Sequence, residues 1–155
     1  MTDTSRRPRF TGLERAQNQG SSIERDDAVE RLWAIAPYLC DRVGGGLHLS
    51  GDVLAPDVAG WRRDRLPALP EDAFFSLSPD WICEVVSPAT AAMDRGKKLG
   101  IYARERVAHA WMVDPIARTL EVLRLESGRW SILSTASDLA VVRAEPFEAL
   151  EWICP

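Results

Sequence analysis

The stretch SPDWICEVVSPATAAMDRGKKLGIYARERVAHAWMVDP, residues 78–115, contains two short apolar segments on either side of a longer amphipathic one. The first, residues 81–86, lies between two prolines, and a short bounded run of this kind is typical of a buried strand. The second, residues 110–113, ends at an Asp-Pro pair and predicts another. A strand, a helix and a strand predict parallel neighbours with a right-handed crossover. Ligands bind beyond the carboxyl ends of such strands, here near Ser87 and Asp114.

The connecting segment predicts a helix because side chains recur at spacings of three and four on one face: Leu99, Tyr102, Ala103 and, as a polar exception, Arg106. Either Asp94 or Thr90 is suited to cap its start, and the sequence does not choose between them. Lys98 precedes Tyr102 by four residues, so we expect it near the edge of the face that packs on the sheet.

Two carboxylates interrupt apolar stretches of the chain. Glu84 lies in the middle of the first predicted strand, and Asp57 has apolar neighbours on both sides. A carboxylate in a buried strand is costly unless a cation, a proton or hydrogen bonds compensate it. These two positions are therefore candidate functional residues.

Elements before this stretch are predicted from capping and alternation. A Ser-Ser-Ile-Glu capping box at residues 21–24 precedes apolar residues at helical spacing, which predicts a helix over 23–36, with 38–40 as one further turn. Residues 47–50 and 53–55 alternate and predict two strands around a turn. Residues 56–61 continue the second strand or begin another.

Elements after this stretch are predicted mainly as strands. Residues 119–125 and 129–133 predict a hairpin that turns at Ser-Gly, positions 127 and 128. Residues 140–142 predict one more strand, and residues 146–152 a short terminal helix or coil.

Composition fits one globular domain of 155 residues, 46% of them apolar. Residues 1–20 are polar and predict a disordered tail or, alternatively, a basic arm that contacts phosphate, and residues 21–155 form the single domain. No apolar run is long enough to cross a membrane. The net charge of −4 argues against a strongly basic nucleic-acid binder. Three cysteines without a Cys-x-x-Cys pair indicate a reducing, cytoplasmic compartment and no zinc site.

Asp57, Glu84 and Lys98 together suggest a chemistry. Two carboxylates on adjacent strands can hold a divalent cation such as magnesium, which polarises a phosphoryl oxygen and lowers the pKa of bound water. A nearby ammonium can position that water and stabilise charge on the phosphorus. These parts suit phosphodiester hydrolysis. The spacing alone equally allows a structural ion pair between Glu84 and Lys98.

Other motifs favour no second chemistry. His48 and His109, the two histidines, have no partner at ligand spacing and are interpreted as packing or surface residues. Ser87 is outside any Gly-x-Ser-x-Gly pattern, and the glycines at 44–46 are not followed by Lys-Ser or Lys-Thr. The cluster Arg-Arg-Asp-Arg at 62–65 is a basic patch or, alternatively, a solvated loop.

The order of these pieces resembles the Uma-two family, whose members are restriction-endonuclease-like proteins of the PD-(D/E)xK nuclease superfamily. The matching pieces are the PD of residues 56–57, the PDWICEVVSPAT of 79–90, the D-x-x-x-K-x-x-x-Y of Asp94, Lys98 and Tyr102, and the HAWMVDP of 109–115. The resemblance implies an α/β, restriction-endonuclease-like fold, a mixed β-sheet flanked by helices.

The resemblance also implies a site. Asp57 and Glu84 would bind Mg²⁺ or Mn²⁺, and the main-chain carbonyl of Val85 would be a further ligand. The standard superfamily lysine follows the acid by two residues, where this chain has Val86. The lysine of this family lies in the next helix, which points to Lys98.

Three departures accompany the resemblance. Relatives carry a longer N-terminal region, an acidic residue where this chain has glycines at 44–46, and a glycine where it has Arg106. A helix-ending glycine has positive φ, which arginine adopts at a cost. The implied function is a bacterial, Mg²⁺-dependent endonuclease acting on nucleic acid, with DNA expected, and a homodimer as the expected assembly. The alternative is a catalytically inactive nuclease-fold protein that serves as a binding or dimerisation module.

Overall fold

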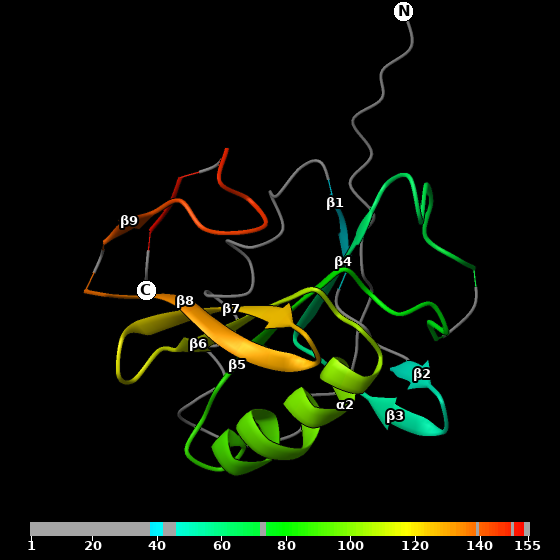
Figure 1. Ribbon diagram of the computed structural model, residues 1–155, viewed down its shortest axis with the longest axis horizontal. Helices are drawn as coiled ribbons and strands as arrows, with labels where there is room; N and C mark the ends of the chain where they lie inside the picture. Colours follow the sequence, from blue (N-terminus) through cyan, green and yellow to red (C-terminus); the bar gives the residue numbers. More distant parts are fainter. Residues whose placement is uncertain (1–37, 42–45, 72–73, 139, 150, 154–155) are drawn as a thin grey trace, which may run out of the picture.

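The computed structural model describes residues 38–41, 46–71, 74–138, 140–149 and 151–153. Its centre is a six-stranded sheet in the order β1-β4-β5-β6-β7-β8 (Figure 1). The strands are β1 (Tyr38–Asp41), β4 (Val58–Arg62), β5 (Trp81–Val85), β6 (His109–Asp114), β7 (Thr119–Glu126) and β8 (Arg129–Ser137). β5 and β6 pair in parallel and the other neighbours pair antiparallel. The predicted parallel pair and its crossover helix are confirmed.

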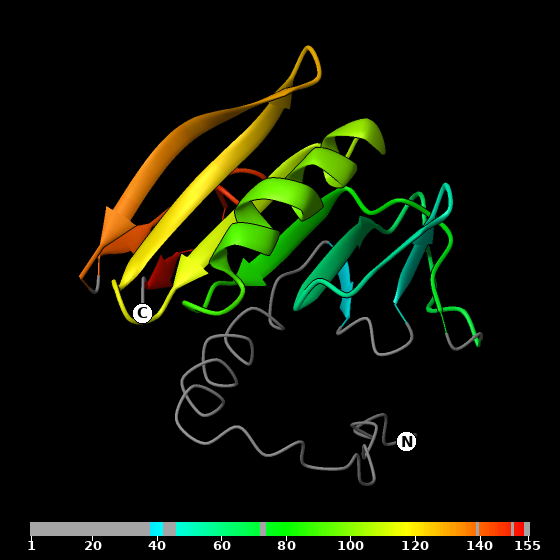
Figure 2. The ribbon, with the colours of Figure 1, turned by 90° about the horizontal axis from the view of Figure 1, so that it is seen from below.

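The crossover consists of η1 (Met93–Lys98), a π-helical segment, followed directly by α2 (Leu99–Arg104). Figure 2 shows it lying across one face of the sheet. Asp94 is inside η1 and buried, so its predicted role as a cap is wrong. Thr90 accepts a hydrogen bond from the amide of Ser87 at 3.1 Å, which closes the turn that precedes the helix.

The helix ends where the family resemblance placed a glycine. Arg106 has φ 60°, the left-handed conformation that glycine adopts most readily. The amide of Arg106 bonds to the carbonyl of Ala103, and the amide of Val107 bonds to the carbonyl of Tyr102. This pair of bonds is a Schellman motif, which satisfies carbonyls left free at a helix end. The expected positive φ at Arg106 is confirmed.

Both predicted hairpins are present. β2 (Leu47–Leu49) and β3 (Asp52–Leu54) form a separate two-stranded sheet, and β7 and β8 form the outer hairpin of the large one. Each turn has two residues with positive φ, Ser-Gly in both cases, as expected for tight turns that match strand twist. The stretch at 56–61 begins a new strand, β4, rather than extending β3.

Two segments differ from their predicted structure. Residues 38–40 were expected as a last helical turn, but they belong to β1, whose backbone pairs with β4. The chain end was expected as helix or coil, but β10 (Trp152–Ile153) pairs with β9 (Val141–Val142), the strand expected near 140–142. In both cases a nearby strand supplies hydrogen-bond partners that local sequence does not reveal. The predicted tail at 1–20 and helix at 23–36 lie outside the described residues.

The sheet separates two apolar clusters. One lies under the helix and includes Ile82, Tyr102 and Met112. The other lies on the opposite face and includes Trp81, Trp111 and Phe147, whose rings meet edge to face at centroid distances of 5.0–5.6 Å. Trp81, Trp111 and Tyr102 are almost completely buried. The described helices are too short and polar to span a membrane.

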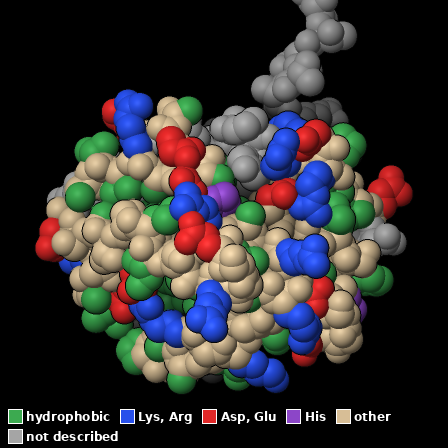
Figure 3. Space-filling model, viewed as in Figure 1, with side chains coloured by type: hydrophobic (Ala, Val, Ile, Leu, Met, Phe, Trp, Pro, Cys, Tyr) green, Lys and Arg blue, Asp and Glu red, His purple; other side chains and the backbone are tan. Residues whose placement is uncertain are grey.

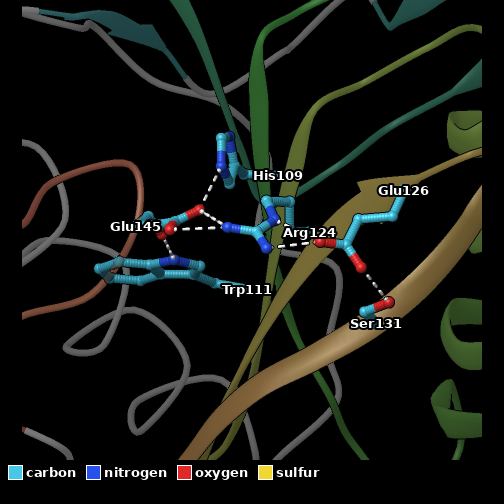
Figure 4. Close-up of polar contacts among 6 residues, drawn as sticks. All are labelled: His109, Trp111, Arg124, Glu126, Ser131 and Glu145. Atoms are coloured by element: carbon cyan, nitrogen blue, oxygen red, sulfur yellow. Dashed lines mark hydrogen bonds and ion pairs between the residues drawn. The ribbon is translucent and has the colours of Figure 1, made fainter.

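Glu145 fastens the C-terminal segment to the second face (Figure 4). Its carboxylate lies 3.0 Å from Nε2 of His109 and accepts a hydrogen bond from Nη1 of Arg124, while its carbonyl accepts one from Trp111. These contacts hold the backbone next to Phe147 against the sheet. They also give His109 a structural partner, in keeping with its interpretation as a packing residue.

Candidate functional site

The pairing of β4 with β5 brings the two candidate carboxylates together. The register sets Val58 opposite Cys83, so the next residues outward, Asp57 and Glu84, face each other. Residues directly opposite in an antiparallel pair have Cβ atoms roughly 5 Å apart. Oδ2 of Asp57 accepts a hydrogen bond from the amide of Val85 at 2.8 Å, which fixes it beside Glu84. Alternation along β5 directs Glu84 toward the helix and its neighbours Cys83 and Val85 toward the opposite cluster.

Glu84 is completely buried and both of its oxygens have partners. Oε1 accepts a hydrogen bond from the hydroxyl of Tyr102 at 2.8 Å, and Oε2 lies 3.0 Å from Nζ of Lys98. Burial raises the pKa of Glu84 to about 7, against the opposing effects of Lys98 and Tyr102, and the charge of Asp57 raises it further. The carboxyl of Glu84 is therefore harder to ionise than an ordinary glutamate, because Lys98 and Tyr102 offset its burial only in part.

Lys98 lies between acceptors from three elements. Its Nζ is 3.0 Å from Oε2 of Glu84, 2.8 Å from Oδ1 of Asp94 and 3.4 Å from the carbonyl oxygen of Ala55. Burial opposes its charge, but Glu84 and Asp94 together raise the pKa of Lys98 above its ordinary value. Lys98 is therefore a charged ammonium with 16% of its side chain exposed.

The helix presents three polar side chains to this site. Asp94, Lys98 and Tyr102 are spaced by four residues, so successive turns place them on the same face. The π-helical segment η1 contains the first two of them. π-Helical turns are rare and occur frequently at functional sites.

The structure thus brings together Asp57, Glu84 and Lys98, the three residues predicted to form the site. Their catalytic roles stay predictions, as does the carbonyl of Val85 as a metal ligand. Asp94 and Tyr102 belong to the motif D-x-x-x-K-x-x-x-Y on which the family resemblance rests, but they were interpreted as a cap and as core and were given no role in the site. Their four-residue spacing from Lys98 was the signal that could have identified such a role, once Glu84 was known to face the helix.

The residues present fit a divalent cation. Carboxylate oxygens are the ligands that Mg²⁺ and Mn²⁺ prefer, and here Asp57 and Glu84 face each other at the end of two strands. Within the described ranges, no group of three or more His, Cys, Asp and Glu side chains is placed to hold a metal ion. Magnesium sites commonly keep several waters and use one or two carboxylates, so two protein carboxylates suffice.

The basic cluster at 62–65 is partly neutralised. Arg62 pairs with Asp64 at 2.7 Å, and Arg65 pairs with Asp80 at 2.6 Å. On the face drawn in Figure 3, Lys and Arg side chains are interspersed with Asp and Glu rather than gathered in one patch. These contacts support the interpretation of the cluster as a solvated loop.

Comparison with known proteins gives two matches. A sequence model of the Uma2 family, described as "Putative restriction endonuclease", matches residues 27–154. Among solved structures, the chain is similar to "a putative nuclease belonging to DUF820 from Anabaena variabilis", with a TM-score of 0.68 and 18% sequence identity over 92% of this chain and 82% of that one. At this identity the likeness shows the fold alone, and it confirms the expected restriction-endonuclease-like mixed sheet. No match was found among curated proteins.

Proposed function

Because the chain belongs to the Uma2 family, we propose that it is a metal-dependent endonuclease that hydrolyses phosphodiester bonds of nucleic acid, with DNA the expected substrate. One observation carries the proposal beyond the family: two buried carboxylates, Glu84 and Asp94, share a single ammonium, Lys98, next to the carboxylate of Asp57. Buried carboxylates that share one ammonium are costly to ionise unless a further positive charge binds, either a proton or a metal ion. A divalent cation would supply it.

Each residue has a role in this proposal. Magnesium or manganese held by Asp57 and Glu84 would polarise a phosphoryl oxygen and acidify a bound water. Lys98 would position the attacking water and stabilise the charge that develops on the phosphorus. Tyr102 would keep the carboxylate of Glu84 in one orientation, because its hydroxyl donates to Oε1 from a fully buried position.

An inactive nuclease-fold protein is the alternative, and one contact favours it. The direct 3.0 Å pair between Lys98 and Glu84 in a buried setting is what a purely structural ion pair requires. That alternative predicts that Glu84→Gln keeps the fold and whatever binding the protein performs, and that no divalent ion binds at these residues.

The test combines calorimetric titration of Mn²⁺ with cleavage of plasmid and single-stranded substrates in Mg²⁺ or Mn²⁺. We expect wild type to bind Mn²⁺ and to cleave, and Asp57→Ala and Glu84→Ala to lose both. Lys98→Met is expected to cleave at least about 100-fold more slowly while still binding the ion, because the ammonium acts on the reaction and not as a ligand.

Asp64→Ala is the matched control, since it removes an exposed carboxylate that pairs with Arg62, away from the candidate site. It should behave as wild type in both assays. Wild-type cleavage by Asp57→Ala or Glu84→Ala would refute the assignment of the site. Absence of Mn²⁺ binding and of cleavage in wild type would favour the inactive alternative.

A further inference from the structure

Asp94 is a buried carboxylate that the two-carboxylate site does not use. Only 1% of it is exposed, and it lies within the π-helical segment η1. Its Oδ1 is 2.8 Å from Nζ of Lys98. Among the described residues, its Oδ2 has no hydrogen-bond partner. A buried acceptor without a partner is costly, so its presence calls for an explanation.

Lys98 and a metal ion would compete for the same oxygen. Oε1 of Glu84 is taken by the hydroxyl of Tyr102, and Oε2 faces Nζ of Lys98 at 3.0 Å. A divalent cation that approaches Oε2 meets the ammonium there, and two cations on one oxygen repel each other strongly in a buried site. Binding of the ion is therefore easier if Lys98 can move to another acceptor.

Asp94 is placed to be that acceptor. It already holds Lys98 through Oδ1, at a shorter distance than Glu84 does, and its second oxygen is available for another of the three ammonium donors. We propose that Asp94 is a positioning residue that retains Lys98 when Glu84 turns to the metal ion. This inference rests on the proposed function, because it assumes an ion at Glu84.

The contacts of Asp94 do not indicate a role within its own helix alone, such as capping. Asp94 does not cap the helix, since η1 has no side-chain cap bond, and the cation it pairs with is Lys98. Its neighbour Arg95 pairs instead with Glu121 of β7. An unmatched buried oxygen is costly for a residue that serves stability alone, whereas a residue that accepts Lys98 in two positions would use both oxygens.

The test is a double-mutant cycle on Mn²⁺ affinity, measured by calorimetry with Mn²⁺ alone. Wild type, Asp94→Asn, Lys98→Met and the double variant are compared. We expect Asp94→Asn to weaken Mn²⁺ binding about tenfold when Lys98 is present, because Lys98 then stays on Glu84, and less than about threefold in the Lys98→Met background. Asp94→Glu, which restores a carboxylate, should recover most of the affinity.

Glu121→Gln is the matched control for loss of charge. Glu121 lies two strands from Glu84 on the same face of the sheet, at roughly 10 Å, and it pairs with the helix through Arg95. It should change Mn²⁺ affinity less than about threefold in either background. An equal loss caused by Asp94→Asn in both backgrounds would show a simple charge effect and would overturn the inference while leaving the proposed function intact. Failure of wild type to bind Mn²⁺ would overturn the inference, and if wild type also fails to cleave nucleic acid the proposed function is overturned as well.

A crystal structure of the wild-type protein with Mn²⁺ tests the same point if Asp94→Asn does not fold. We expect Nζ of Lys98 within about 3.2 Å of Asp94 and withdrawn from Glu84, whose Oε2 contacts the ion. The proposal is refuted if the structure contains a bound ion while Lys98 is still bonded to Glu84 and Oδ2 of Asp94 still has no partner.

Discussion

In Glu84, burial and negative charge oppose each other, and the proposed metal site depends on that opposition. It is fully buried, its pKa is raised to about 7 chiefly by burial, and its ordinary value is 4.5. The unfolded chain therefore loses this proton near pH 4.5, whereas the folded protein keeps it until about pH 7. The stability linked to this group is present at low pH and is lost as the pH rises through that interval.

We therefore expect the metal-free protein, kept in chelator, to lose about 3 kcal/mol of unfolding free energy between pH 4.5 and pH 7 relative to Glu84→Gln. Urea unfolding of both proteins across this range measures the difference. Glutamine cannot ionise, so the two stability curves should diverge as the pH rises. Parallel curves would mean that Glu84 is ionised throughout, fully compensated by Lys98.

At the scale of single residues, the sequence reveals a carboxylate inside an apolar segment more readily than it reveals which residue that carboxylate contacts. Asp57 and Glu84 stood out because a carboxylate inside an apolar segment needs compensation. Asp94 was part of the motif behind the family resemblance but was given no role in the site, because an aspartate near a helix start is ordinary as a cap. Only the fold shows that its side chain turns inward to Lys98, so its candidate role could not be read from the chain alone.

At the scale of elements, local sequence patterns predicted those helices, strands and turns whose structure depends mainly on their own residues. The segment from β5 through α2 to β6 followed from apolar periodicity, and the two Ser-Gly turns followed from turn chemistry. β1 was misassigned because pairing with β4, whose residues lie 18 to 24 positions further along the chain, decides its structure. The π-helical segment was not predicted, because its hydrogen-bond pattern has no counterpart in the spacing of apolar residues.

Arg106 tests the helix terminus. Its φ of 60° is adopted by arginine at a cost that glycine avoids, and the Schellman bonds hold the backbone there. We expect Arg106→Gly to raise the free energy of unfolding by about 0.5–1 kcal/mol, measured by urea denaturation. The same change at Lys97, an exposed residue inside η1, should lower it by a similar amount. Destabilisation by Arg106→Gly would show that the arginine side chain, and not backbone strain, determines the stability of this end.

At the scale of the whole molecule, the sheet has the candidate site on one face and an apolar cluster that stabilises the fold on the other. The candidate site lies on the helix side, between β4, β5 and the crossover, while the cluster of Trp81, Trp111 and Phe147 lies on the other side. The net charge is −4, and on the face in Figure 3 the described basic side chains are mixed with acidic ones, so that face offers no broad basic surface for nucleic acid. A bound divalent ion would therefore contribute much of the local attraction for phosphate.

This separation predicts that the two faces respond differently to mutation. Phe147→Ala should lower the free energy of unfolding by about 3–5 kcal/mol, because it removes a buried ring that packs on Trp81 and Trp111. Its Mn²⁺ affinity, measured calorimetrically below the unfolding transition, should equal that of wild type. Leu99→Ala is the matched comparison: it also creates a cavity, but directly after Lys98 on the site face, so we expect it to change Mn²⁺ affinity as well. A loss of Mn²⁺ binding in folded Phe147→Ala would show that the cluster on the far face helps to hold β5 in register, and that Glu84 depends on both sides of the sheet.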